Sequence, residues 1–367
     1  MVFTGFFYAY RFVRHILCCM NRLTTLPFAA SQQPSVRRAM FAGSSYPSSE
    51  RELSTLLDNA LNVLDTSLDT VPDSVSKTLQ SPSSPTPSSQ TVHDVQSQWN
   101  IPKPIKRGAS AIIAPHIDFR VGLSCYAPAY YALQDSQAEV FIVIATSHYG
   151  WQDLFIPTFQ HFSTPLGTVK TDVELLNSIY HRCPYPLTRD DTAHREEHSI
   201  EFEVVWLQHT FGHRPFTIVP ILVTSFYPFI QQCVSPAQMP KFQQFINAVR
   251  EAIAESGKRV AWVVSGDMAH VGRKFGDSEN AAQMMQRVHR EDVELLRAME
   301  YADAEAYYQR IAEHNDSYKI CGLPPVYSML YAAQPTQGVV LDYQHWLEHS
   351  TRSAVTYSSV AYYGELH

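Results

Sequence analysis

The chain has 367 residues, of which 45% are hydrophobic and 17% are charged, so it has enough apolar material for a folded core and too little charge for a disordered chain. Its net charge of −7 provides no overall basic field, which argues against a protein that binds nucleic acid or an anionic membrane surface. The six cysteines include no CxxC pair, which disfavours a disulfide framework or a zinc ribbon and favours a reducing compartment.

Residues 1–38 are predicted to be an N-terminal extension outside the folded domain. The first 49 residues contain several arginines but no Asp or Glu, a composition typical of an organelle transit segment. The alternatives are a poorly ordered extension or translation that starts at Met20 or Met40. We therefore expect a cytoplasmic protein, or a mitochondrial one if this segment acts as a transit signal. Arginines interrupt the longest apolar run, so stable membrane insertion is not expected.

Residues 39–367 are predicted to be one domain with an insertion. From about 67 to 107 the chain is mainly Ser, Pro, Thr and Gln, with no apolar period to bury, which indicates a disordered insertion or long loop. Residues 39–65 are expected to form a helical hairpin that packs on the rest. We expect a folded domain to remain when the extension and the insertion are deleted.

The remaining pattern predicts an α/β fold with a largely parallel or mixed central sheet flanked by helices. Short apolar runs predict buried strands at Ala111–Ala114, Val140–Ala145, Phe216–Val223 and Val260–Val264. Helical patterns lie between and after them, near Gly122–Leu133, Lys170–His181, Lys241–Ser256 and Asn280–Glu300. Gly338–Tyr343 and Ser353–Gly364 are predicted to add edge strands. No glycine-rich phosphate loop is present, so a nucleotide cofactor is not supported.

Reactive side chains follow three of the predicted strands directly. His116 follows the first run, His148 follows the second, and Asp267 and His270 follow the last. Ligands gather at the carboxyl ends of strands in open α/β sheets, so these groups are expected to meet at one edge. Imidazole and carboxylate groups placed together in this way indicate a metal or acid–base site.

Two further candidates lie elsewhere in the chain. His198 and Glu201 are three residues apart and would share a face if this segment is helical, although a solvated acidic first turn of a helix explains the same pattern. Cys321 lies at a turn that leads into a predicted helix. It is either a small buried hydrophobic residue or a thiolate favoured by the N-terminus of that helix.

Six motifs follow one another along the chain: Met40–Pro47, Ile113–His116, Ser147-His148, Glu197–Glu201, Ser265–His270 and Ile320–Gly322. Taken together, they resemble the Memo family, whose members include mediators of ErbB2-driven cell motility and protein B of a microbial radical-enzyme-associated system. The resemblance covers nearly all of the chain outside residues 1–38 and the insertion.

The resemblance implies a fold shared with class III extradiol dioxygenases, which hold non-haem iron at strand ends. By position, it implies that His116, His148 and Cys321 bind the metal, with iron or copper as the expected ion. It places Asp267, His270 and His198 nearby as groups that handle protons or orient ligands, with Asp118 and Glu201 as further supporting residues. A thiolate replaces the usual third carboxylate and suits copper as well as iron, whereas Asp118 could restore a harder ligand set.

Three functions remain open from the sequence. The first is a metal-dependent redox or dioxygenase-like protein that acts on an unknown small molecule. The second is a non-catalytic signalling protein that binds a protein or peptide partner in the same cleft, with a vestigial metal site. The third is a purely structural role, in which the histidines are satisfied hydrogen-bond partners in the core.

Overall fold

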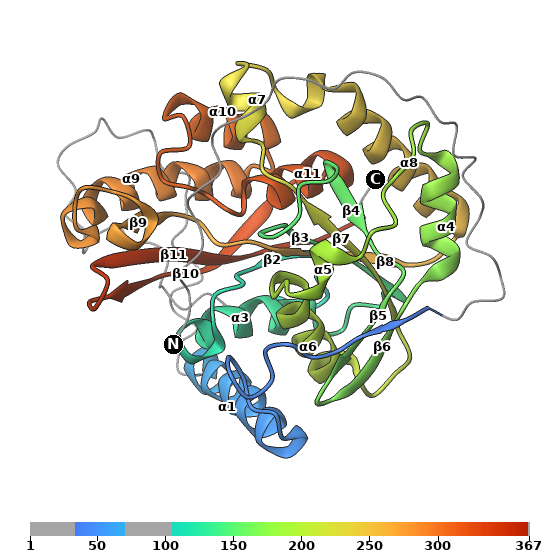
Figure 1. The fold of residues 1–367 in the computed structure, drawn as a ribbon. Coiled ribbons are helices and arrows are strands. Elements are labelled where there is room, and N and C mark those ends of the chain that lie inside the picture. Colours follow the sequence, from blue (N-terminus) through green and yellow to red (C-terminus); the bar gives the residue numbers. More distant parts are fainter. Residues whose placement is uncertain (1–33, 70–104, 366–367) are drawn as a thin grey trace, which may run out of the picture.

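The structure, a computed structural model, describes residues 34–69 and 105–365 of the chain, and its side chains are described except at residues 65–69. Most of the predicted N-terminal extension and of the predicted insertion lies outside these residues. The described part forms a central sheet between two layers of helices (Figure 1). Within it, no helix combines the length and apolar character needed to cross a bilayer.

The described sheet has eleven strands, whose main path runs β1-β5-β6-β7-β3-β8-β2-β11-β10, with β4 beside β7 and β9 beside β11. The strands are β1 (Val36–Arg37), β2 (Ala111–Ala114), β3 (Val140–Thr146), β4 (Phe155–Pro157), β5 (His161–Thr164), β6 (Gly167–Thr171), β7 (Thr217–Val223), β8 (Val260–Ser265), β9 (His270–Gly272), β10 (Gly338–Glu348) and β11 (Ser353–Tyr362). The central strands β7, β3, β8 and β2 are parallel, whereas β11 is antiparallel to both of its main-path neighbours. The sheet is therefore mixed.

Helices cover both faces of the sheet because the central strands are apolar on both faces. On β3, Phe141 and Val143 belong to one core cluster, whereas Ile142 and Ile144 belong to the other. One face is covered by α1 (Glu50–Asp69), α3 (Phe119–Leu133) and α6 (Ser199–Phe211), and the other by α4 (Val173–Arg182), α8 (Pro240–Ser256), α9 (Ala281–Glu300), α10 (Ala304–Glu313) and α11 (Leu323–Ala333) (Figure 1). Short helical turns are α5 (Thr192–Arg195), α7 (Tyr227–Gln231), η2 (Pro236–Gln238) and η3 (Arg273–Phe275).

The predicted α/β class is confirmed, as is the mixed sheet flanked by helices. The strand at Ala111–Ala114 has the predicted bounds, and the other three predicted central strands each differ by one residue at one end. The helix predicted from Lys170 instead begins at Val173, because Lys170 and Thr171 belong to β6 and Asp172 caps the helix by accepting from the Leu175 N–H.

Two predictions about the ends of the domain are wrong. Residues 39–65 do not form a helical hairpin, because residues 39–49 are mainly turns that precede the single helix α1. The strand β11 is not an edge strand, because it lies between β2 and β10, and α3 and α9 also contact it. All of its residues, the serines included, are buried. Only β10 of this pair ends the sheet's main path.

The strand β1 lies before the predicted domain boundary at residue 38. Its Arg37 is buried, and its guanidinium forms a 2.5 Å ion pair with Glu201 on α6. The same guanidinium donates hydrogen bonds of 2.6 Å to the backbone carbonyls of His194 and Glu197. The structure therefore connects the N-terminal segment directly to the helix that follows the His198 motif.

Candidate metal centre

Three candidate site residues follow neighbouring parallel strands and lie at one edge of the sheet. His116 follows β2, Asp267 follows β8, and His148 follows β3, in strands that are adjacent in the order β3-β8-β2. His198, at the start of α6, completes a group of three imidazoles. The ring centroids of His116 and His148 are 5.0 Å apart, those of His116 and His198 are 5.1 Å apart, and those of His148 and His198 are 4.9 Å apart.

Cys321 reaches this group from the turn before α11. Its Sγ lies 3.2 Å from Nε2 of His116. Two glycines allow the turn to approach the end of β8 so closely: a Cβ added at Gly266 would lie 2.6 Å from the Cα of Gly322. The N–H of Gly322 also donates a 2.9 Å hydrogen bond to the carbonyl of Asp267. A side chain at either glycine would clash with the facing backbone, so this close approach requires glycine at both positions.

Glu197 holds His148 in place, and its role was not singled out from the sequence. One carboxylate oxygen accepts from Nδ1 of His148 at 2.9 Å, and the other accepts from the His148 backbone N–H at 2.7 Å. Glu197 is only 1% exposed, whereas the adjacent Glu196 is exposed. The local pattern could not show which of these neighbouring acids is buried, because that depends on contact with the distant β3 strand end.

The other predicted site residues have different surroundings. His270, at the start of β9, donates a hydrogen bond from Nδ1 to the Met268 carbonyl, 3.1 Å away. Asp118 caps α3 by accepting from the Arg120 N–H and forms an ion pair with the Arg120 side chain. Glu201 does not converge with His198: it accepts from the Met40 and Phe41 backbone N–H groups, Tyr46 and Arg37. Asp118 and Glu201 thus hold helix ends and the N-terminal segment.

Burial and the contact between His148 and Glu197 together set the pKa shifts at the site. Burial, with the nearby His148, His198 and His270, lowers the pKa of His116 well below its usual value, while a backbone hydrogen bond with Ser265 opposes this shift. Burial alone would raise the pKa of Glu197, but the charge and hydrogen bonds of His148 outweigh it and lower the pKa to about 2. Glu197 is therefore an ionised acceptor that keeps a proton on Nδ1 of His148.

The pKa values of Asp267 and Cys321 are both raised, which favours the protonated form of each group. Burial raises the pKa of Asp267 to about 7, although the backbone N–H of His116 and the charge of His148 act against it. Burial and the charge of Asp267 raise the pKa of the Cys321 thiol well above its usual value. Without a bound ion, the protonated thiol is therefore the favoured form of Cys321, because desolvation disfavours the charged thiolate.

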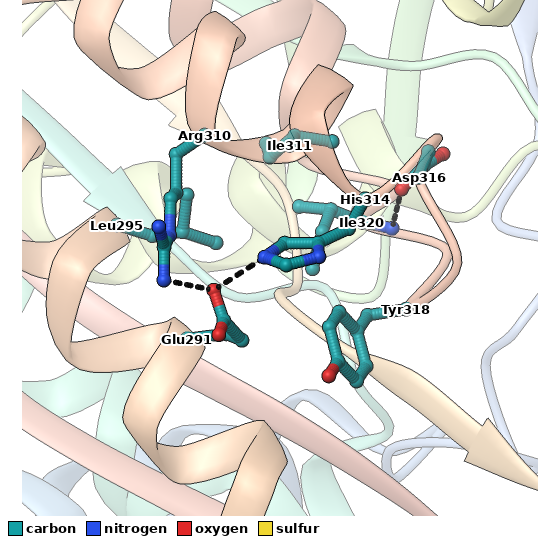
Figure 2. Close-up of a pocket in the computed structure, with 8 residues that line it drawn as sticks. All are labelled: Glu291, Leu295, Arg310, Ile311, His314, Asp316, Tyr318 and Ile320. Carbon is teal, nitrogen blue, oxygen red and sulfur yellow. Dashed lines mark hydrogen bonds and ion pairs between the residues drawn. The ribbon is translucent and has the colours of Figure 1, made fainter.

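A separate pocket lies beside the turn that precedes α11 (Figure 2). Figure 2 shows Glu291 between Arg310 and His314, whose nitrogens lie 2.7 and 3.2 Å from the same carboxylate oxygen. Asp316 accepts a 2.8 Å hydrogen bond from the backbone N–H of Ile320. None of the candidate metal ligands lines this pocket. Its polar contacts support the turn and do not extend the candidate metal centre.

The donor atoms fit a metal ion. Ligand atoms of His116, His148 and Cys321 all lie within 4.8 Å of one another, and the same holds for the group Asp267, His270 and Cys321. Nδ1 of His148 is engaged by Glu197, which leaves Nε2 of that ring for an ion. Two imidazoles and a sulfur are a borderline-to-soft donor set that suits iron or copper better than magnesium or calcium.

The fold and the site together define an α/β protein with two histidines at strand ends and a cysteine before α11, a His/His/Cys group that could hold a metal. A family model described as "Memo-like protein" matches residues 82–364, and the chain belongs to the Memo family. The chain is 26% identical over 258 residues to a MEMO1 family protein of Aquifex aeolicus, covering 70% of this chain and 64% of that relative, slightly under two thirds. Similar relatives are MEMO1 family proteins of Methanosarcina acetivorans, 26% identical over 64% of this chain and 76% of the relative, and of Archaeoglobus fulgidus, 26% identical over 67% and 83%.

Proposed function

We propose that this chain is a metal-dependent redox or dioxygenase-like protein in which His116, His148 and Cys321 hold an iron or copper ion. The observation that carries the proposal is the convergence of their ligand atoms within 4.8 Å at the carboxyl ends of β2 and β3 and at the turn before α11. His116 is buried and His148 and Cys321 are partly buried, and ligands held by internal hydrogen bonds are typical of sites built to bind a metal. We expect the protein to act in the cytoplasm on a small molecule.

A bound ion would supply Lewis acidity or one-electron chemistry at this site. The residues of the chain would orient the substrate and move protons. Asp267 lies beside the metal ligands, with one carboxylate oxygen 3.8 Å from Nε2 of His116. Its pKa of about 7 suits a group that both accepts and donates protons near neutral pH. His198 and His270 are the other proposed proton carriers.

A second candidate is a binding protein that captures a peptide partner beside the same site. The observation that favours it is Trp151, which is 82% exposed and lies three residues beyond His148. Exposed tryptophan is a common anchor of protein interfaces. In this candidate the metal group would stiffen the binding surface. Substrate turnover by the metal-loaded protein would favour the first candidate, and peptide binding without turnover would favour the second.

Elemental analysis of anaerobically purified protein tests the proposal. The wild type is expected to retain iron or copper at close to one ion per chain, and the double variant His116→Ala/His148→Ala is expected to lose it. The matched control is His181→Ala/His213→Ala, which removes two exposed histidines. Metal content that is unchanged in the site variant, or absent from the wild type after reconstitution, would contradict the proposal.

A further inference from the structure

The two histidines proposed as ligands are held by different partners on Nδ1. His148 faces the ionised carboxylate of Glu197. His116 instead faces the hydroxyl of Ser265, whose Oγ lies 3.3 Å from Nδ1 of the ring. Its nearest carboxylate, Asp267, lies 3.8 Å from the other ring nitrogen, beyond hydrogen-bond distance. The Ser265 backbone also forms a hydrogen bond with His116, so the position of the His116 proton depends on two neutral groups of Ser265.

The hydrogen bonds of Ser265 decide which partner donates. A serine hydroxyl has one proton to donate and can accept through its lone pairs. Ser265 donates this proton to the backbone carbonyl of Ser199, with an Oγ–O distance of 2.7 Å. Because its proton is used in this way, the Oγ of Ser265 can only accept from His116. Nδ1 of His116 must therefore carry the proton of this hydrogen bond. His116 and Ser265 are both buried, so bulk water does not compete for this contact.

We propose that Ser265 is a positioning residue that holds His116 as the Nδ1–H tautomer. Nε2 of His116 lies 3.2 Å from Cys321 Sγ. In this tautomer its lone pair is free to bind an ion that His116 and Cys321 would coordinate together. A neutral imidazole binds a metal through its unprotonated nitrogen. In the opposite tautomer Nε2 would carry the proton and could not bind the ion. The link to metal binding rests on the function proposed above, whereas the tautomer itself does not.

The test measures the tautomer in the metal-free protein. Two-bond ¹H–¹⁵N correlation spectra of ¹⁵N-histidine-labelled protein at neutral pH report which nitrogen of each ring is protonated. The His116 signals are identified by their loss in His116→Gln. The wild type is expected to show Nδ1–H. Ser265→Ala removes the hydroxyl and keeps the Ser265 backbone partner, and it is expected to raise the population of the Nε2–H tautomer above that of the wild type.

Ser199→Ala is the matched control. It also removes a fully buried serine hydroxyl, but this hydroxyl donates to the Thr146 carbonyl, and Ser265 uses only the Ser199 backbone. The control is therefore expected to keep the wild-type His116 tautomer. If the wild type shows Nε2–H, or if Ser265→Ala keeps Nδ1–H as fully as the wild type, the proposal is overturned.

Metal titration gives a second readout. The affinity of Ser265→Ala for copper(I) or iron(II) is expected to fall about 10- to 100-fold, as is usual when a group that orients a ligand is removed. Ser199→Ala is expected to show a much smaller change. If the wild type binds neither ion but shows Nδ1–H that is lost in Ser265→Ala, the proposed function fails and the assignment of Ser265 stands.

Discussion

The backbone N–H of His116 donates a 2.9 Å hydrogen bond to Oδ1 of Asp267. The two residues follow neighbouring parallel strands, β2 and β8, so this bond ties together two strand ends that are 151 positions apart in the chain. The carbonyl of Asp267 also accepts from Gly322, beside Cys321. Asp267 therefore connects the segments that carry two of the proposed ligands.

Asp267→Asn is expected to lower metal affinity about 10- to 100-fold, because it removes a negative charge beside the ion while the amide oxygen can still accept from His116. Isothermal titration with copper(I) or iron(II) measures the change. Asp292→Asn is the matched control, since Asp292 is also a buried carboxyl whose pKa is raised by burial to about 7. Equal affinity of Asp267→Asn and wild type would leave Asp267 with a purely structural role.

Cys321 is expected to determine which metal is preferred. Cys321→Ser removes the soft donor and should reduce affinity for copper(I) far more than affinity for a hard divalent ion, whereas Cys321→Asp should shift preference toward iron(II). Copper(I) competition titrations compare these variants with Cys321→Ala and with Cys183→Ser, a buried cysteine outside the group. Identical copper(I) affinities in the wild type and the Ser and Ala variants would eliminate Cys321 as a ligand.

Metal binding is expected to release protons. The raised pKa of the Cys321 thiol means that it is protonated at neutral pH and must lose about one proton to bind an ion. His148, whose pKa is also raised because Glu197 outweighs its burial, should add a fraction of a proton. Affinity should therefore weaken as pH falls. Calorimetry in buffers of different ionisation enthalpy measures the release, and a Cys321→Ser signal equal to that of the wild type would refute this source.

Arg37 is expected to be part of the folded domain. Arg37→Met leaves the Glu201 carboxylate buried without its ion-pair partner, which typically costs about 3–5 kcal/mol. Arg38→Met, at an exposed neighbour, should change the free energy of unfolding little. Deletion of residues 1–33 keeps Arg37 and is expected to leave urea unfolding cooperative. Deletion of residues 1–38 removes Arg37 and should lower the free energy of unfolding strongly. Equal stability of the two truncated proteins would contradict this boundary.

Asp292 is expected to make stability fall with rising pH. Burial raises its pKa to about 7, above the unfolded value, so folding takes up a proton between these two values. The stabilisation is complete below about pH 4 and is lost as pH rises to about 7. Asp292→Asn keeps an acceptor for the Tyr343 hydroxyl, 2.7 Å away, and removes this dependence. Urea unfolding at about pH 5 and about pH 8 should show a larger loss in the wild type than in the variant.

The sequence by itself determined the α/β class, the central strands and the side chains that follow them. Uninterrupted apolar runs such as Val140–Ala145 have few alternatives to a strand covered on both faces, and parallel strands place His116, His148 and Asp267 at one edge. These are consequences of local pattern and of sheet geometry, so they do not depend on details of packing.

Only the tertiary structure decided which polar groups support the site and which stabilise the fold elsewhere. Glu197 and Glu201 occur in one short motif, yet the first binds His148 and the second binds Arg37, because each faces a segment far away in the chain. Contacts between distant segments also decide three other features: the direction of the Cys321 pKa shift, the internal position of β11 and the place of the Ser265 hydroxyl beside His116. The burial of a side chain and its hydrogen-bond partners depend on contacts between distant segments, so a local sequence pattern cannot predict them.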